Sequence, residues 1–152
     1  MLVPTSLLLQ KFLANALAVV SSGNFNGELS AAKIGVFTNN VTPTQNTLYA
    51  DLTKPTYTGY ADQTATFATP TRRATGGFNT ISAQLKFQMP DAVNPTLIYG
   101  TYITDGAGSP ALLGVEVIPG GPITLADALD ALYAVMMVSI GGSDFGQGEY
   151  TT

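Results

Sequence analysis

Residues 95–119 constrain the fold more than any other stretch of this chain. Two runs rich in β-branched and aromatic residues, 97–104 and 111–118, flank a loop of turn-forming residues at 105–110. The two glycines of that loop can take positive φ and its proline fixes its own φ, which favours re-entry into a second strand. The pattern therefore predicts a β-hairpin.

Both strands of this hairpin are apolar on both faces. Because side chains alternate along a strand, Leu97, Tyr99 and Ile103 would point one way, and Ile98 and Tyr102 the other. A strand at a solvated edge would alternate more clearly between apolar and polar residues. We therefore expect the hairpin to be covered on both sides, by a second sheet or by a neighbouring subunit.

The rest of the chain also favours short strands separated by turn signals. Strands are expected at 33–38, 56–62, 65–69, 79–89 and 132–140. An edge strand or irregular crossing is expected at 48–52, and a short helix or a turn at 125–132. This pattern predicts a mainly β fold, a single antiparallel β-sandwich of jelly-roll type with an N-terminal helix.

Residues 79–89 give the clearest alternation of period two. Apolar residues would share the core face and polar residues the outer face. The core face would hold Ile81, Ala83, Leu85, Phe87 and Met89, and the outer face Ser82, Gln84, Lys86 and Gln88.

The N-terminal part has helical rather than strand periodicity. Leu9, Leu13 and Leu17 lie one helical turn apart, which predicts a helix at 5–20. A signal peptide is disfavoured because no basic residue precedes the apolar run, and the run is too short and interrupted for a membrane span. We expect three parts: a helical anchor at 1–22, the β-domain at 23–140 and a Gly-rich tail at 141–152.

The composition favours a surface buried in an assembly. Only 11% of the residues are charged, against 45% hydrophobic, and the net charge is −4. So few charges protect a free monomer poorly against association, although a neutral Thr- and Asn-rich surface would also keep it soluble. No basic stripe is present, so direct binding to nucleic acid is not expected.

The sequence shows no pattern typical of an active site. It contains no His and no Cys, and its ten acidic residues are scattered. Asp127 and Asp130 could meet on a helical face, and Asp105 could contribute one calcium ligand, but a solvated helix end and a turn are the commoner roles. We expect no enzyme, no cofactor and no metal site. The tyrosines could form a sugar-stacking surface, or serve simply as strand and interface residues: Tyr49, Tyr57, Tyr60, Tyr99 and Tyr102.

Two stretches carry a family resemblance. Residues 48–60 read Leu-Tyr-Ala-Asp-Leu-Thr-Lys-Pro-Thr-Tyr-Thr-Gly-Tyr, and 98–105 read Ile-Tyr-Gly-Thr-Tyr-Ile-Thr-Asp. Together they resemble small β-rich structural proteins of tailed bacteriophages, over about 33–140. The sequence departs from that pattern at 127–130, where a Gly-containing turn would be expected, and the N-terminal helix lies outside it.

The resemblance implies a virion protein without catalytic residues. We expect a capsid decoration or cement protein that packs against the major capsid protein and copies of itself. A tail or neck component and a glycan-binding adhesin module are the alternatives. The expected assembly interface comprises Leu9, Phe12, Leu13, Leu17, Tyr99 and Tyr102.

Overall fold

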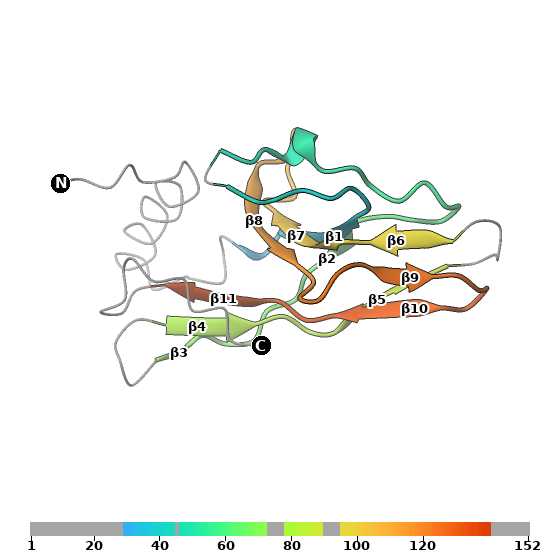
Figure 1. Cartoon of the computed structure of the whole chain (residues 1–152). Helices are drawn as coiled ribbons and strands as arrows, with labels where there is room; N and C mark the ends of the chain where they lie inside the picture. Colours follow the sequence, from blue (N-terminus) through green and yellow to red (C-terminus); the bar gives the residue numbers. More distant parts are fainter. Residues whose placement is uncertain (1–28, 45, 73–77, 90–94, 141–152) are drawn as a thin grey trace.

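The computed structural model of the chain describes residues 29–44, 46–72, 78–89 and 95–140 (Figure 1). Within these ranges the protein is mainly β, as predicted, and its sheets are antiparallel. No helix in these ranges is long and apolar enough to cross a membrane. The helix predicted at 5–20 and the anchor and tail segments lie outside the described residues.

Most strands are short and are grouped into four sheets. A four-stranded sheet has the order β2-β1-β7-β8, a three-stranded sheet the order β11-β4-β3, and two further pairs are β10-β5 and β6-β9. The strands are β1 (Lys33–Phe37), β2 (Gln63–Thr64), β3 (Thr71–Arg72), β4 (Phe78–Ile81), β5 (Leu85–Gln88), β6 (Thr96–Ile98), β7 (Gly100–Thr104), β8 (Leu112–Val117), β9 (Ile123–Leu125), β10 (Ala131–Ala134) and β11 (Met137–Ile140).

The predicted hairpin is confirmed as β7 and β8, but the first strand is shorter than expected. The chain breaks at Tyr99, whose N–H donates to Phe37 O and whose carbonyl accepts from Ile118 N–H. Before this break, β6 pairs with β9 rather than with β8. The break also changes which residues share a face: Ile98 lies in the same core as Ile103, and not with Tyr102 as predicted.

Both faces of β7 are covered, and the chain itself supplies both covers. On one face Ile103 packs into the main core, which includes Phe87 and Ala134 from the second layer. On the other face Tyr102 packs with Phe37 and Leu52 under the segment that connects β1 to β2. The expectation of a double cover is therefore confirmed for β7, and the chain itself provides it. In β8 it does not hold throughout, because Glu116 and Val117 are exposed.

A second layer lies across the main core from the four-stranded sheet. The β5–β10 pair and the β4–β11 pair run end to end as one ribbon beneath that sheet (Figure 1). The buried side chains between the layers include Ile34, Ile98, Phe87, Met89 and Leu125. This burial of apolar area is the main stabilising contribution that holds the layers together.

The ribbon contains a bulge that shifts half of the predicted alternation. Ala134 lies opposite Leu85, but Met137 lies opposite Ile81, so three residues on one strand face two on the other. Consecutive residues Ala83 and Gln84 are both exposed as a result. The predicted core face holds for Phe87 and Met89 but is wrong before the bulge. There Ile81 is exposed and Thr80 and Ser82 are buried.

Several predicted elements are turns instead. Tyr57 to Tyr60 form a hydrogen-bonded turn with Gly59 at φ 85°, where a strand was expected at 56–62. Residues 49–51 form the 3-10 helix η1 (Tyr49–Asp51) rather than a strand. Of the strand expected at 65–69, the structure keeps a single bridge, between Phe67 and Ser82.

The ambiguous segment at 125–132 is a turn and not a helix. The Asp130 carboxylate accepts hydrogen bonds from the backbone N–H groups of Ala126 and Asp127. Leu129 takes a left-handed conformation with φ 76°, the place where a glycine would be expected. The predicted last strand, 132–140, is divided into β10 and β11 by the bulge region.

Candidate functional site

The densest group of polar side chains surrounds the carboxylate of Asp62, beside β1. Asp62 Oδ1 accepts from Tyr102 Oη at 2.7 Å and from Tyr60 Oη at 3.1 Å. Asp62 Oδ2 accepts from Lys54 Nζ at 2.9 Å and from Tyr49 Oη at 3.2 Å. We call these five residues the tyrosine cluster. They join η1 and the following loop to the central strand β7.

Tyr60 completes the edge of β1 where β2 has ended. Its hydroxyl accepts from Val36 N–H at 2.9 Å and lies 3.1 Å from Val36 O. The single hydroxyl proton is donated either to that carbonyl or to Asp62. The backbone groups of Val36, which would otherwise lack a strand partner on this side, are therefore satisfied by a side chain.

The cluster also depends on a glycine beneath it. A Cβ at Gly35 would collide with the ring carbon and hydroxyl of Tyr102, and would lie 2.7 Å from Asp62 Oδ1. Tyr102 is completely buried, and Tyr49 meets its ring edge-on with centroids 5.5 Å apart. The absence of a side chain at Gly35 therefore allows the tyrosine ring and carboxylate to approach the strand closely.

The charge states of the cluster make it a stabilising network rather than a reactive centre. Burial alone would raise the pKa of Asp62, but hydrogen bonds from Tyr102 and Lys54 outweigh it and lower that pKa. Burial raises the pKa of Tyr60 and of Tyr102. Asp62 therefore stays ionised and both phenols stay neutral at pH 7, and each is held in hydrogen bonds. Such groups are poor candidates for a general acid or a nucleophile.

The predicted interface residues have different positions. Leu9, Phe12, Leu13 and Leu17 lie outside the described residues. Tyr99 is half-buried at the break between β6 and β7. Tyr102 has no exposed surface to offer a partner, so its assignment to an interface is wrong.

Other candidate sites prove to be turns or internal contacts. Asp105 Oδ1 accepts from the N–H groups of Ala107 and Ala111, so this aspartate stabilises the hairpin loop. Tyr57 packs edge-on against Tyr60, whose ring stacks on Phe87. Of the five tyrosines considered for a sugar-stacking surface, Tyr102 is buried, and the other four are each partly buried: Tyr49, Tyr57, Tyr60 and Tyr99. Among the residues the structure describes, no three acidic side chains converge as metal ligands would.

A row of apolar side chains lies exposed on the outside of the ribbon. Tyr133, Val135 and Met137 alternate with buried neighbours, and Ile81 lies directly opposite Met137. We call these four residues the outer stripe; each is between 46% and 55% exposed. The stripe was missed in the sequence because 132–140 is apolar at nearly every position, so periodicity could not separate its two faces.

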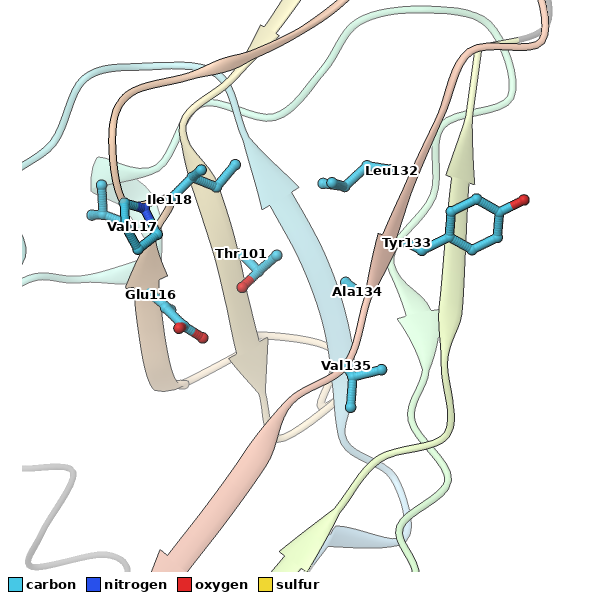
Figure 2. Close-up of a pocket in the computed structure, with 9 residues that line it drawn as sticks. Thr101, Glu116, Val117, Ile118, Leu132, Tyr133, Ala134 and Val135 are labelled. Atoms are coloured by element: carbon cyan, nitrogen blue, oxygen red, sulfur yellow. The ribbon is translucent and has the colours of Figure 1, made fainter. Parts of the chain in front are cut away.

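A shallow groove opens where β8 borders the ribbon. It has a volume of about 170 Å³ and lies between Thr101 and Glu116 on one side and residues 132–135 on the other (Figure 2). Leu132 and Ala134 contribute apolar side chains, whereas the Tyr133 ring points away from it (Figure 2). Glu116 is its one ionisable side chain apart from that tyrosine, so the groove offers little that would fix a small polar ligand.

Comparison of the chain with protein-family models, with curated proteins and with solved structures finds no match. The geometry of the protein itself therefore carries the functional argument. That geometry comprises a satisfied internal polar network, an exposed apolar stripe and a shallow groove.

Proposed function

We propose that the chain is a virion structural protein that acts by packing against neighbouring proteins. In its most specific form, it is a decoration or cement protein on the capsid of a tailed bacteriophage, and a tail or neck component is the second assignment. The proposed partners are the major capsid protein and further copies of the chain. We also propose that the two layers form one β-sandwich of jelly-roll type. No catalytic step is part of this proposal.

The outer stripe is the observation that carries the packing role. Four large apolar side chains lie about half-exposed on adjacent strands, in a chain with few charges to keep that face solvated. Contiguous exposed apolar surface of this kind marks interaction sites more often than free surface. Burial of such a face releases about 25 cal/mol per Å² of apolar area, and symmetric repetition multiplies that contribution over many copies.

Replacement of two residues of the stripe tests this role. Ile81→Ser and Met137→Ser together remove apolar area from the outer face and leave the buried core unchanged. The affinity of the double variant for particles should fall at least about tenfold, which is a loss of roughly 1.4 kcal/mol of binding free energy. The measurement is occupancy on purified particles that lack the chain, titrated with the variant. Leu129→Ser is the matched control because Leu129 is 72% exposed but lies in the turn before β10. Equal occupancy of the double variant and the wild type would contradict a packing role for the stripe.

Residues 1–22 are proposed as a second anchor. Their removal should weaken incorporation into particles while the β-domain remains folded by circular dichroism. Full occupancy by the truncated chain would show that these residues are not an anchor.

A further inference from the structure

The outer edge of β8 differs from the other long edge of the four-stranded sheet. On the β1 side, β2 and the Tyr60 hydroxyl satisfy the backbone groups that face away from β7. On the opposite side the sheet ends at β8, which at six residues is its longest strand and pairs only with β7 among the described residues (Figure 1).

The hydrogen-bond register shows which groups of β8 face outward. Ile118 N–H donates to Tyr99 O at 2.8 Å, and Glu116 lies opposite Thr101. In an antiparallel pair the bonding direction alternates from one residue to the next, so residues 114, 116 and 118 bond to β7. The N–H and C=O groups of Val115 and Val117 therefore point away from the sheet.

We propose that this edge pairs with β8 of a second copy of the chain, antiparallel and across a twofold axis. A strand edge is complementary to itself under such a twofold, because the outward N–H and C=O groups of one copy meet the outward C=O and N–H groups of the other. The β8 edge also lacks the lysines and prolines that commonly block edge pairing, and Val115 and Val117 are β-branched residues suited to cross-strand contact.

The single charge on β8 selects the register. Pairing centred on Glu116 would place the two Glu116 carboxylates directly opposite each other, which is unfavourable. Pairing centred on Val115 sets Val115 opposite Val115 of the partner copy, and it places each Glu116 opposite Gly114 and each Val117 opposite Leu113. We therefore assign the register centred on Val115. This pairing needs only the chain itself and does not rest on the proposed virion role.

Removal of one outward backbone N–H from β8 tests the pairing of the two copies. Val117→Pro removes an N–H that points away from β7, so the fold loses no ladder bond while the edge loses a donor. Val117→Thr is the matched control because it keeps both the N–H and the β-branched shape. By sedimentation velocity over a wide concentration range, the wild type and Val117→Thr should form dimers, and Val117→Pro should remain monomeric with an unchanged circular dichroism spectrum. A wild type that is monomeric throughout, or a Val117→Pro variant that dimerises as well as the wild type, would overturn the proposal.

Disulfide trapping tests the register without a blocking variant. The natural chain has no cysteine, so Val115→Cys and Glu116→Cys each introduce a single thiol. In the assigned register the two Cα atoms at 115 are about 5.5 Å apart, which suits a disulfide, whereas those at 116 are roughly 8 Å apart, which does not. Oxidation should cross-link Val115→Cys and leave Glu116→Cys without a covalent cross-link. The reverse result would overturn the register, and cross-linking of neither variant would overturn the pairing.

Discussion

Replacement of Asp62 by Asn should destabilise the protein although the two side chains have nearly the same shape. The carboxylate is 11% exposed and has four donors within hydrogen-bond distance, of which Tyr60 shares its proton with Val36 O: Tyr102, Tyr60, Tyr49 and Lys54. Asn keeps one acceptor oxygen but places an NH₂ group, a donor, against Lys54 Nζ, which is itself only a donor.

The size of this loss of stability follows from the hydrogen bonds that change. Bonds to a charged acceptor contribute about 1 kcal/mol more than bonds to a neutral one, and this applies to the two bonds at Oδ1. Loss of the ion pair adds less than about 1 kcal/mol, because Lys54 is 41% exposed and can turn to solvent. We expect Asp62→Asn to lower the free energy of unfolding by about 2 kcal/mol at pH 7, within a range of roughly 1–3 kcal/mol.

Urea unfolding at two pH values is the assay. The folded pKa of Asp62 is depressed, so its charge contributes stability above the unfolded pKa of about 3.9 and that contribution is lost as the pH falls through the folded pKa. The difference between wild type and variant should therefore shrink at about pH 3. Asp127→Asn, at an exposed carboxylate, is the control and should change stability by less than about 0.5 kcal/mol. An Asp62→Asn variant as stable as the control at pH 7, or a difference that grows in acid, would refute the reasoning.

Three further changes test other parts of the structure. Burial raises the pKa values of Tyr60 and Tyr102, so their contribution to folding stability is complete below about pH 10 and is lost as the pH rises further. Tyr102→Phe should lower the free energy of unfolding by about 1–2 kcal/mol at pH 7, but this variant should lose less stability than the wild type between about pH 9 and pH 11. An equal dependence of the free energy of unfolding on pH in the two proteins, measured by urea unfolding, would contradict this. Gly106→Ala should destabilise the protein by more than about 2 kcal/mol, because φ is 70° and the new Cβ would collide with Ala31 O. Gly59→Ala is the control: its φ is 85° but no atom lies near the new Cβ, so it should cost only about 1 kcal/mol. Equal melting temperatures of the two variants would count against the close contact at Gly106. Leu129→Gly should stabilise by about 0.5–1 kcal/mol, because it relieves a left-handed φ of 76°, and a lower melting temperature would show that the Leu side chain outweighs that strain.

Local patterns in the sequence predicted the parts of the fold that depend on neighbouring residues. The β7–β8 hairpin follows from its loop of glycines and proline between two β-rich runs, and the double cover of β7 follows from apolar residues on both faces. The bulge at Ala83 and Gln84 could not be predicted in this way, because it is defined by where the partner strand β10–β11 shifts. The alternation within 79–89 does not show how many residues of the partner strand lie opposite it, and residues 82–84 face only two, 135 and 136.

The candidate sites were harder to predict for a related reason. The tyrosine cluster combines η1, the loop to Asp62 and strand β7, and its members carry no shared spacing in the sequence. The prediction that Tyr102 lies at an interface was wrong because an apolar second face was assigned to a partner, whereas the segment at 38–62 folds over it. The turn at Leu129 shows the same limit, since a left-handed leucine gives no local signal.

The most direct test of the packing role is the composition of purified virions from cells that produce this chain. Quantitative mass spectrometry should find the chain in a fixed, high copy number relative to the major capsid protein, because a packing protein repeats with the symmetry of the surface that it covers. A chain that is absent from the particles, or present only in trace amounts that vary between preparations, would contradict the account.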